Sequence, residues 1–441
     1  MTARINFIRL AGLPPSRRSE LLQRTESDLA PYLDQVKPVI AAVRAEGDEA
    51  LARFARQFDH AAVEARELAA TEEDFERARK DLAPDVAEAI GFAATNIRKF
   101  HEAQKPGEMW LHEIRPGVFA GERTSAIPSV ACYVPRGKGS FPSTALMSCI
   151  PATVAGVEHI CIITPPGPDG AIDTATLVAA HAACISKVYK AGGAQGIAAV
   201  AFGTQTIAKC AKVVGPGSPW VVAAKRLLAD VIDTGPPAGP SESIIFADPT
   251  ADGRLAALDL LIEAEHGPDS SAFLVTTSEA VAQAALRAIP GYWTSMGAER
   301  VAFTQAVLGS TRGGILLARD TAEAMDFIND YAPEHLQILA SEPFAYLGQV
   351  KHAGEILLGA HTPSTLGNYV IGANHVLPTG GWARTFSALS VADFQKRTSL
   401  AYVTSAGYPD MARHAKVFAT YEGFDAHANA VSEMRTKLLG N

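Results

Sequence analysis

The feature that most constrains the fold is a series of short apolar segments, bounded by glycine or proline, that alternate with longer helical segments. The series begins near residue 125 with IPSVACYVP and continues through HICIITPP, GIAAVAFG, SESIIFADP, SSAFLVTTS, GGILLARD and GEILLGAH. Short apolar strands that alternate with helices are typical of βαβ units, whose parallel sheets are covered by helices on both faces. The alternation is long enough for two such sheets, so we predict an α/β fold.

Helical patterns flank this region. Residues 16–104 are alanine-rich and helical in pattern, and Thr71 is the expected N-cap of a helix whose first turn is acidic. The last 50 residues are also expected to be helical. No nucleotide-binding fingerprint stands out, because GKGSFPS (137–143) is not GxGxxG and the glycines of AGGAQGIAAVAFG (191–203) are better explained by a tight turn.

Bulk composition narrows the class of protein. At 441 residues the chain is too long to form a single compact core, so two or more domains are expected. A net charge of -8 favours neither a nucleic-acid nor a membrane partner, and no apolar stretch is long enough to span a bilayer. The five cysteines form no CxxC pair and the first residues contain no apolar leader, which together predict a cytoplasmic protein.

A carboxylate and an imidazole stand side by side in YAPEHLQIL (331–339). The proline restricts the backbone before them, and the apolar run from Leu336 to Leu339 indicates a buried strand. Glu334 and His335 are therefore expected on a fixed turn at a strand entrance. From these residues alone, the pair is either a proton-handling site or a solvated corner.

Three other segments combine polar groups with helix or loop ends. Glu263 and His266 share a helix face just before Gly267-Pro268, which fits either a two-ligand metal element or a histidine favoured by the helix dipole. Functional groups concentrate at such element ends. The remaining pairs are Asn368 with His375, and Glu422 with His427.

These motifs, taken in order, resemble the histidinol dehydrogenase family. They are AGPSE (238–242), EAEHGPDS, APEHL, GANHVLPT and EGFDAHANAV, preceded by YVPRGKGSFPSTALM, PATVAG, GGAQGIAAVAFGT and VVGPGS. The resemblance covers essentially the whole chain. It implies oxidation of an alcohol to a carboxylate in two NAD-dependent hydride steps through a bound aldehyde. It also implies one Zn²⁺ per subunit and a homodimer with shared active sites.

The family fold implies two incomplete Rossmann-like parallel-sheet domains and small helical N- and C-terminal domains. By position, residues 1–28 are a helical arm, and residues 133–242 are an inserted, NAD-binding α/β domain. Residues 29–132 and 243–389 are expected to form the split larger α/β domain. Residues 390–441 are expected to reach the partner subunit and complete its site.

The resemblance also assigns roles to the paired bases and to the metal ligands. Glu334 matches the residue that activates water in the second step, and His335 matches the residue that accepts the proton of the alcohol, a task suited to an imidazole. The family ligands Gln, His, Asp and His correspond to Glu263, His266, Asn368 and His427.

The metal-ligand set departs from the family pattern at two positions, Glu263 and Asn368, where acid and amide have exchanged places. The number of carboxylates stays at one, and zinc accepts either kind of oxygen. We infer that the metal is retained and that the shifted charge reshapes the substrate pocket.

Other positions match residues that contact substrate or cofactor in the family. Arg136 and Lys138 are additions to the first motif, which usually reads YVPGG, and Ser218 replaces the amide of the usual GPGN. The expected substrate contacts are Ser143, Ser241, His375 and Glu422, with Arg136 and Lys138 added; the expected cofactor contacts are Tyr133, Gln195 and Ser218.

The two added cations bear on the choice of alcohol. Histidinol is itself a cation, whereas Arg136 and Lys138 would suit an anionic group unless they are ordinary surface charges. With the exchanged ligands, they favour a small anionic diol such as 2,3-dihydroxypropane-1-sulfonate, oxidised to 3-sulfolactate as in sulfopropanediol dehydrogenase relatives of the family. Histidinol remains the alternative, and a zinc-dependent hydrolase or a non-catalytic homologue are alternatives from other classes.

Overall fold

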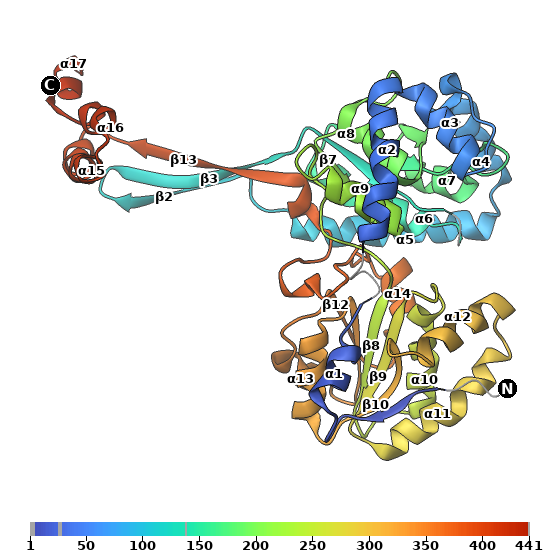
Figure 1. Ribbon diagram of the computed structural model, residues 1–441. Helices are drawn as coiled ribbons and strands as arrows, with labels where there is room; N and C mark the ends of the chain where they lie inside the picture. The colour runs from blue at the N-terminus through green and yellow to red at the C-terminus, as the bar shows by residue number, and fades with distance from the viewer. Residues whose placement is uncertain (1–4, 25–28, 137–138, 440–441) are drawn as a thin grey trace. The chain divides into compact units, whose positions relative to one another are not determined.

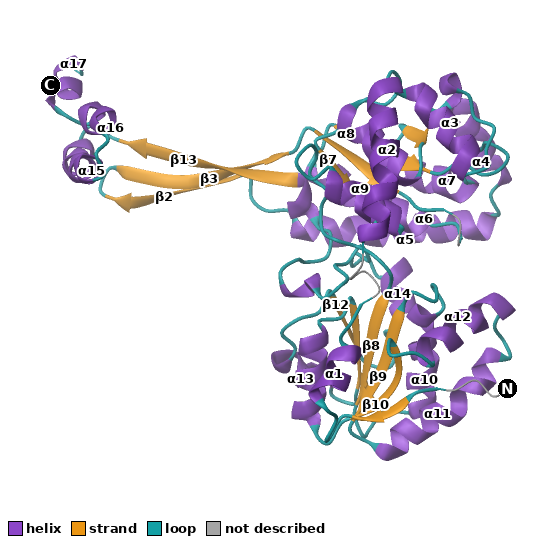
Figure 2. Ribbon diagram, viewed as in Figure 1, coloured by secondary structure: helices purple, strands orange, loops and turns teal. Residues whose placement is uncertain are grey.

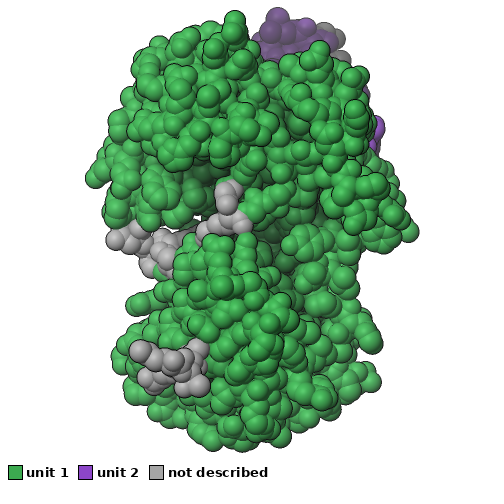
Figure 3. All heavy atoms as spheres, turned by 90° about the vertical axis from the view of Figure 1, so that its right-hand side faces the viewer, with its two compact units in different colours: residues 1–104, 127–394 green, residues 105–126, 395–441 purple. Residues whose placement is uncertain are grey.

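The computed structural model describes residues 5–24, 29–136 and 139–439. It divides into two compact units. The first unit, residues 1–104 with 127–394, holds two parallel sheets (Figure 1), and the second unit comprises residues 105–126 with 395–441 (Figure 3). The predicted α/β fold with two parallel sheets is therefore confirmed. No helix of the described residues is both long and apolar enough to cross a membrane.

The larger sheet has six parallel strands in the order β1-β10-β9-β8-β11-β12. Its side chains alternate between two cores, so that Ile245 packs on one face while Ile244 and Phe246 pack on the other. Helices cover both faces (Figure 2), which explains why these strands read as continuous apolar runs. The strands are β1 (Phe7–Arg9), β8 (Glu242–Ala247), β9 (Ser271–Thr276), β10 (Gly313–Leu317), β11 (His335–Leu339) and β12 (Glu355–Leu358).

The two helical layers of this six-stranded lobe differ in origin. One core joins the sheet to three consecutive helices, and the other joins it to two helices that are far apart in the sequence. The first layer contains α10 (Gly253–Ala264), α11 (Glu279–Trp293) and α12 (Ala298–Leu308), and the second contains α1 (Pro15–Leu21) and α13 (Thr321–Tyr331). The shorter elements that follow are η3 (Pro343–Gln349), α14 (Ser364–Tyr369), η4 (Trp382–Arg384) and η5 (Val391–Phe394).

The smaller sheet has four parallel strands in the order β6-β5-β4-β7. Its strands are β4 (Ser129–Tyr133), β5 (His159–Thr164), β6 (Val188–Lys190) and β7 (Lys212–Val214). The expected strand GIAAVAFG is instead a buried helix that lies between β6 and β7 in the sequence. The helices of this four-stranded lobe are α2 (Ala30–Glu46), α3 (Asp48–Phe58), η2 (Ala65–Glu67), α4 (Glu72–Asp81), α5 (Pro84–Gln104), α6 (Pro142–Ala155), α7 (Thr174–Ala182), α8 (Gly193–Phe202) and α9 (Pro219–Leu227). Thr71 caps α4 as predicted, because its hydroxyl accepts a hydrogen bond from the Asp74 amide.

The observed packing differs from the expected domain division. Buried residues from Val36 to Leu68 share one core with residues of the four-stranded sheet, so α2 and α3 pack there and not with residues 243–389. Residues 29–132 therefore do not belong wholly to the larger lobe. The N-terminal segment also differs from a helical arm, because β1 pairs with β10 at the edge of the six-stranded sheet.

The second unit contains a three-stranded antiparallel sheet in the order β13-β3-β2. The expectation of helix throughout the last 50 residues is wrong for β13, which pairs with β3 from Gln395 opposite Ala126 to Val403 opposite Val118. Its elements are β2 (Met109–Arg115), β3 (Val118–Ala126), β13 (Gln395–Val403), α15 (Tyr408–Tyr421), α16 (Asp425–Ala430) and α17 (Glu433–Leu438).

Candidate active site

The predicted acid–imidazole pair lies where β11 begins, directly after α13. The connecting Ala332 has a left-handed backbone (φ 52°) and is fully buried, and Pro333 follows it. Two backbone hydrogen bonds of 2.9 Å then tie this turn to the start of β12: Gly354 N donates to Pro333 O, and Glu355 N donates to Glu334 O. The start of β11 is therefore fixed by the buried turn that precedes it and by the start of β12 beside it.

His335 is buried among three carboxylates. Its Nδ1 donates to Glu355 Oε2 at 2.9 Å, while its Nε2 lies 3.9 Å from Glu334 Oε1 and 4.0 Å from Glu263 Oε1. Burial opposes the imidazolium, but the three negative charges outweigh it and raise the pKa of His335 to about 10. Burial also raises the pKa of Glu334 well above its usual value, reinforced by the charge of Glu263 and opposed by that of His335.

A second network orients Glu334. Its Oε2 accepts a hydrogen bond from Glu242 N at 2.9 Å, which leaves Oε1 to face the imidazole. The side chain of Glu242 in turn accepts from Arg24 Nε at 2.8 Å and from Gly380 N at 2.9 Å. The guanidinium carbon of Arg24 lies over the Tyr331 ring, 3.4 Å from its centroid. The water-activating candidate is thus fixed by the strand β8 next to it.

Three of the four predicted metal ligands come together beside His335. Glu263, on α10, is 1% exposed, and its Oε2 accepts no hydrogen bond from the described part of the chain. His266 Nε2 lies 3.5 Å from that oxygen, and Asn368 Nδ2, from α14, donates to Glu263 Oε1 at 2.8 Å. Burial opposes the charge of Glu263, but the two neighbouring imidazoles and the amide hydrogen bond hold its pKa below the usual value.

This donor set fits zinc. Two ligands of a tetrahedral zinc site lie roughly 3.4 Å apart, close to the separation of the Glu263 and His266 atoms. Ser241 Oγ is 3.0 Å from His266 Nδ1, a contact that orients a ligating imidazole. Asn368 would present its oxygen after rotation of the amide. Among the described residues no three His, Cys, Asp or Glu side chains form a metal-binding group, since the third member is an asparagine and His427 belongs to the second unit.

His375 follows α14 in the chain and folds back onto it. Its Nδ1 donates to the Asn368 carbonyl, and burial lowers the pKa of His375 to about 4, so the ring is neutral near pH 7. The loop is anchored by the preceding Asn374, whose Nδ2 donates to Met147 O at 2.6 Å and lies 3.2 Å from His101 Nε2. His375 therefore offers a neutral imidazole for hydrogen bonding.

The expected cofactor contacts gather at the carboxyl edge of the four-stranded sheet. Tyr133 ends β4, and its hydroxyl accepts from Gly193 N at 3.3 Å. Gln195 lies in the first turn of α8, and Ser218 is the N-cap residue of α9, with no side-chain capping hydrogen bond. Ser143, which was expected to contact substrate, lies in the first turn of α6. Helix N-termini at the carboxyl ends of parallel strands are suited to binding the phosphates of a dinucleotide.

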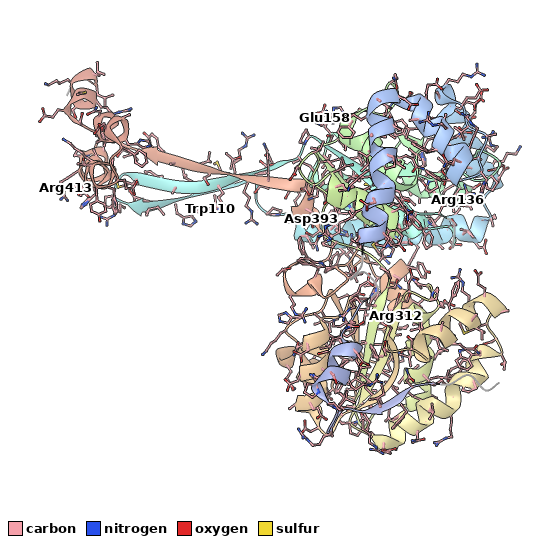
Figure 4. All side chains as sticks on the ribbon, in the orientation of Figure 1. Trp110, Arg136, Glu158, Arg312, Asp393 and Arg413 are labelled. Atoms are coloured by element: carbon pink, nitrogen blue, oxygen red, sulfur yellow. The ribbon has the colours of Figure 1, made fainter. Side chains whose placement is uncertain are left out.

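Of the two added cations, only Arg136 lies within the described residues. Arg136 donates to Ala171 O at 2.9 Å and lies in the four-stranded lobe (Figure 4). It is also near Asp59, where burial raises the pKa of the carboxyl to about 6 against the opposing charges of His60 and Arg136. Lys138 lies outside the described residues.

Glu422 and His427 belong to the second unit. Glu422 is the C-cap of α15, and His427 lies in α16 with its ring centroid 5.4 Å from that of Phe424. Both are exposed in the single chain. Their contribution to the zinc and substrate sites stays a prediction.

Sequence reasoning missed Glu355, which faces His335, and the pair of Glu242 with Arg24. Glu355 stands at the start of the apolar segment GEILLGAH, as Glu334 stands directly before the strand that begins at His335. This shared position of a glutamate beside an apolar run is the sequence signal that could have identified Glu355. Arg24 lies in a polar segment with no pattern that ties it to a site.

Comparison with known proteins places this geometry in context. The family model described as Histidinol dehydrogenase matches residues 22–435. A Mesorhizobium japonicum protein named Histidinol dehydrogenase homolog 2 is 57% identical over 99% of both chains. Histidinol dehydrogenase of a Synechocystis species is 48% identical over 98% of this chain and 99% of its own length. The crystal structure of histidinol dehydrogenase from Elizabethkingia anophelis superposes with a TM-score of 0.93 over 99% of both chains, at 33% identity.

Proposed function

This chain belongs to the histidinol dehydrogenase family of NAD-dependent oxidoreductases, and we propose that it oxidises a primary alcohol to a carboxylate in two hydride transfers. The observation that carries the proposal is the placement of His335. One ring nitrogen is fixed by Glu355, and the other faces both Glu334 and the carboxylate of Glu263. A hydrolase needs no such second base beside the one that activates water.

In the first step, His335 Nε2 takes the hydroxyl proton while the hydride leaves the same carbon for NAD. An alcohol is a poor hydride donor until that proton is removed, which is the task of a general base within hydrogen-bond reach. Without metal, the neighbouring carboxylates keep His335 protonated. A zinc ion held by Glu263, His266, Asn368 and His427 would supply positive charge that offsets these carboxylates and favours the neutral imidazole, and it would polarise the substrate hydroxyl.

In the second step, Glu334 takes a proton from the water that adds to the aldehyde. Its Oε2 is occupied by the Glu242 amide, so Oε1 is the oxygen available for this transfer. Burial raises the pKa of Glu334 and the positive charge of His335 opposes that shift, so the imidazolium formed in the first step favours the carboxylate form of Glu334. The second hydride then leaves the hydrated carbon, and the product is the carboxylate.

For the substrate, we favour a small anionic diol, 2,3-dihydroxypropane-1-sulfonate, oxidised to 3-sulfolactate. The exchange of acid and amide at Glu263 and Asn368 supports a pocket different from that for histidinol. The 57% identical relative carries the name of a homolog and not that of the enzyme itself, which is consistent with a distinct substrate.

Histidinol is the second candidate, and a specific observation favours it. The side chains of Glu334, Glu263 and Glu355 give the site a negative potential that suits a cationic substrate. Arg136, which would attract an anion, contacts Ala171 instead.

Side-by-side assay of the two alcohols tests the proposal. Purified zinc-loaded enzyme with NAD should form two NADH per alcohol with one of them, and kcat/KM for the preferred alcohol should exceed that for the other by about 10²-fold or more, as expected when buried polar groups are left unpaired. Absence of NADH with both alcohols would contradict the dehydrogenase assignment and favour the hydrolase or the non-catalytic homologue.

We further propose a homodimer in which the second unit covers and completes the partner's site. All seven residues of β2 are exposed in the single chain, including Trp110 (Figure 4). Tyr421 and Leu438 are 89% and 88% exposed. Apolar side chains exposed in this number along one unit mark an interaction surface. The five cysteines are all free, which supports a reducing compartment, for which we propose the cytoplasm.

Mixed dimers test the shared site. Neither His335→Asn nor His427→Ala should be active alone. Equal mixing after dissociation and reassembly should restore roughly a quarter of the wild-type activity, because half of the dimers are mixed and each of these has one intact site. A mixture that stays inactive, although mass spectrometry shows mixed dimers, would contradict sharing.

A further inference from the structure

The Nδ1 side of the His335 imidazole faces Glu355, which has no role in the two proposed reaction steps. Strands β11 and β12 pair in parallel with His335 opposite Glu355, so the two side chains leave the sheet at the same level. Glu355 Oε2 accepts the Nδ1 hydrogen bond at 2.9 Å. The side chains of His335 and Glu355 are 4% and 8% exposed, so water competes little for this contact.

The backbone around Glu355 is built to hold it there. Glu355 N donates a hydrogen bond to Glu334 O. The residue that contacts the His335 ring is therefore also hydrogen-bonded to the residue that precedes His335 in the chain. Gly367, in α14, leaves the necessary room: a Cβ atom at this position would lie 2.9 Å from Glu355 Oε1. The carboxylate is thus enclosed by β11 on one side and by α14 on the other.

We propose that Glu355 is a positioning residue that determines which nitrogen of His335 faces the alcohol. This inference rests on the proposed function. An ionised carboxylate can only accept a hydrogen bond, so when His335 is in its neutral form the remaining proton stays on Nδ1 and the Nε2 lone pair is directed toward Glu334 and Glu263. In the first step the O–H proton passes to Nε2, and the C–H hydride passes to NAD, which becomes NADH. The aldehyde is left with a carbon–oxygen double bond.

The role of Glu355 differs from that of Glu334 although both are carboxylates next to one ring. Glu334 faces Nε2, the side where substrate chemistry takes place, whereas Glu355 faces Nδ1. Loss of the positioning contact should therefore slow the step that needs Nε2 as a base. It should spare aldehyde oxidation, in which Glu334 acts on water.

The variant Glu355→Gln separates these possibilities, since glutamine has the same size but can donate to Nδ1 and so place the proton on Nε2. With zinc-loaded enzyme and the preferred alcohol, kcat should fall by roughly 10²- to 10⁴-fold, the range for a base held in the wrong tautomer. KM should change by less than about threefold, and oxidation of the supplied aldehyde by less than about tenfold. Zinc content and Tm should match the wild type.

Two further variants complete the test. Glu355→Asp keeps a carboxylate and should recover part of the alcohol activity lost in Glu355→Gln, even if the glutamine variant is less stable. Glu299→Gln, at an exposed position of α12, is the matched control and should retain full activity. Wild-type kcat in Glu355→Gln, equal losses for alcohol and aldehyde, or no recovery in Glu355→Asp would each overturn the positioning role. Failure of the wild-type enzyme to form NADH from either alcohol would instead overturn the proposed function.

Discussion

Replacement of His335 by asparagine is expected to lower kcat for alcohol oxidation by about 10³-fold or more, near the upper range for loss of a general base. Asparagine still offers a donor to Glu355 but has no group that can accept the alcohol proton at neutral pH. NADH formation at saturating alcohol measures the effect. Zinc content should stay at one ion per chain, because His335 stands beside the proposed zinc ligands and is not one of them.

Two variants control this result. His159→Asn changes an exposed histidine at the start of β5 and should leave kcat unchanged. Glu263→Leu should lose zinc as well as activity, since it removes the buried carboxylate of the ligand set. Retention of more than a tenth of the wild-type kcat in His335→Asn would contradict its role as the base.

Replacement of Glu334 by glutamine should stop the reaction at the aldehyde. The amide oxygen can still accept from Glu242 N, so the turn should keep its geometry, but an amide cannot deprotonate water. We expect a rapid burst of one NADH per active site and then carboxylate formation slowed by about 10²- to 10⁴-fold. Stopped-flow absorbance gives the burst amplitude, and trapping with a carbonyl reagent identifies the aldehyde.

The control for this change is Glu342→Gln, at an exposed position beyond the end of β11, which should form two NADH per alcohol like the wild type. A burst of two NADH in Glu334→Gln would show that another group activates the water. Loss of the burst itself would show that Glu334 is needed in the first step.

The sequence was informative where structure depends on local pattern. Six of the seven apolar segments form strands as predicted, and the helices over 30–104 and the Thr71 cap also follow from spacing along a short segment. The prediction is wrong for GIAAVAFG, which lies in α8, because a short apolar run fits a buried helix as well as a buried strand. The antiparallel pairing of β3 with β13 was not predictable, because the paired residues are 269 to 285 positions apart in the sequence (Gln395 with Ala126, Val403 with Val118). The side chains of both strands are also largely exposed or half-exposed and show no apolar alternation. An amphipathic helix such as α2 reveals that it has a buried face but not which sheet it covers.

The same distinction applies to the site. Glu334 and His335 could be located from a proline and the strand that follows. The partnership of His335 with Glu355 depends on the register of two parallel strands, which no local pattern specifies. The clustering of Glu263, His266 and Asn368 was inferred from resemblance, and the structure brings these three side chains together.

The left-handed backbone of Ala332 has a consequence for how the enzyme could be made more robust. A non-glycine residue in this conformation costs on the order of 1 kcal/mol, so some conformational strain is stored next to the proposed bases. Glycine at this position would relieve that strain, but it would also make the backbone that positions Glu334 and His335 more flexible. Selection for higher thermal stability at residue 332 would therefore favour a glycine that positions the two side chains less precisely and lowers activity.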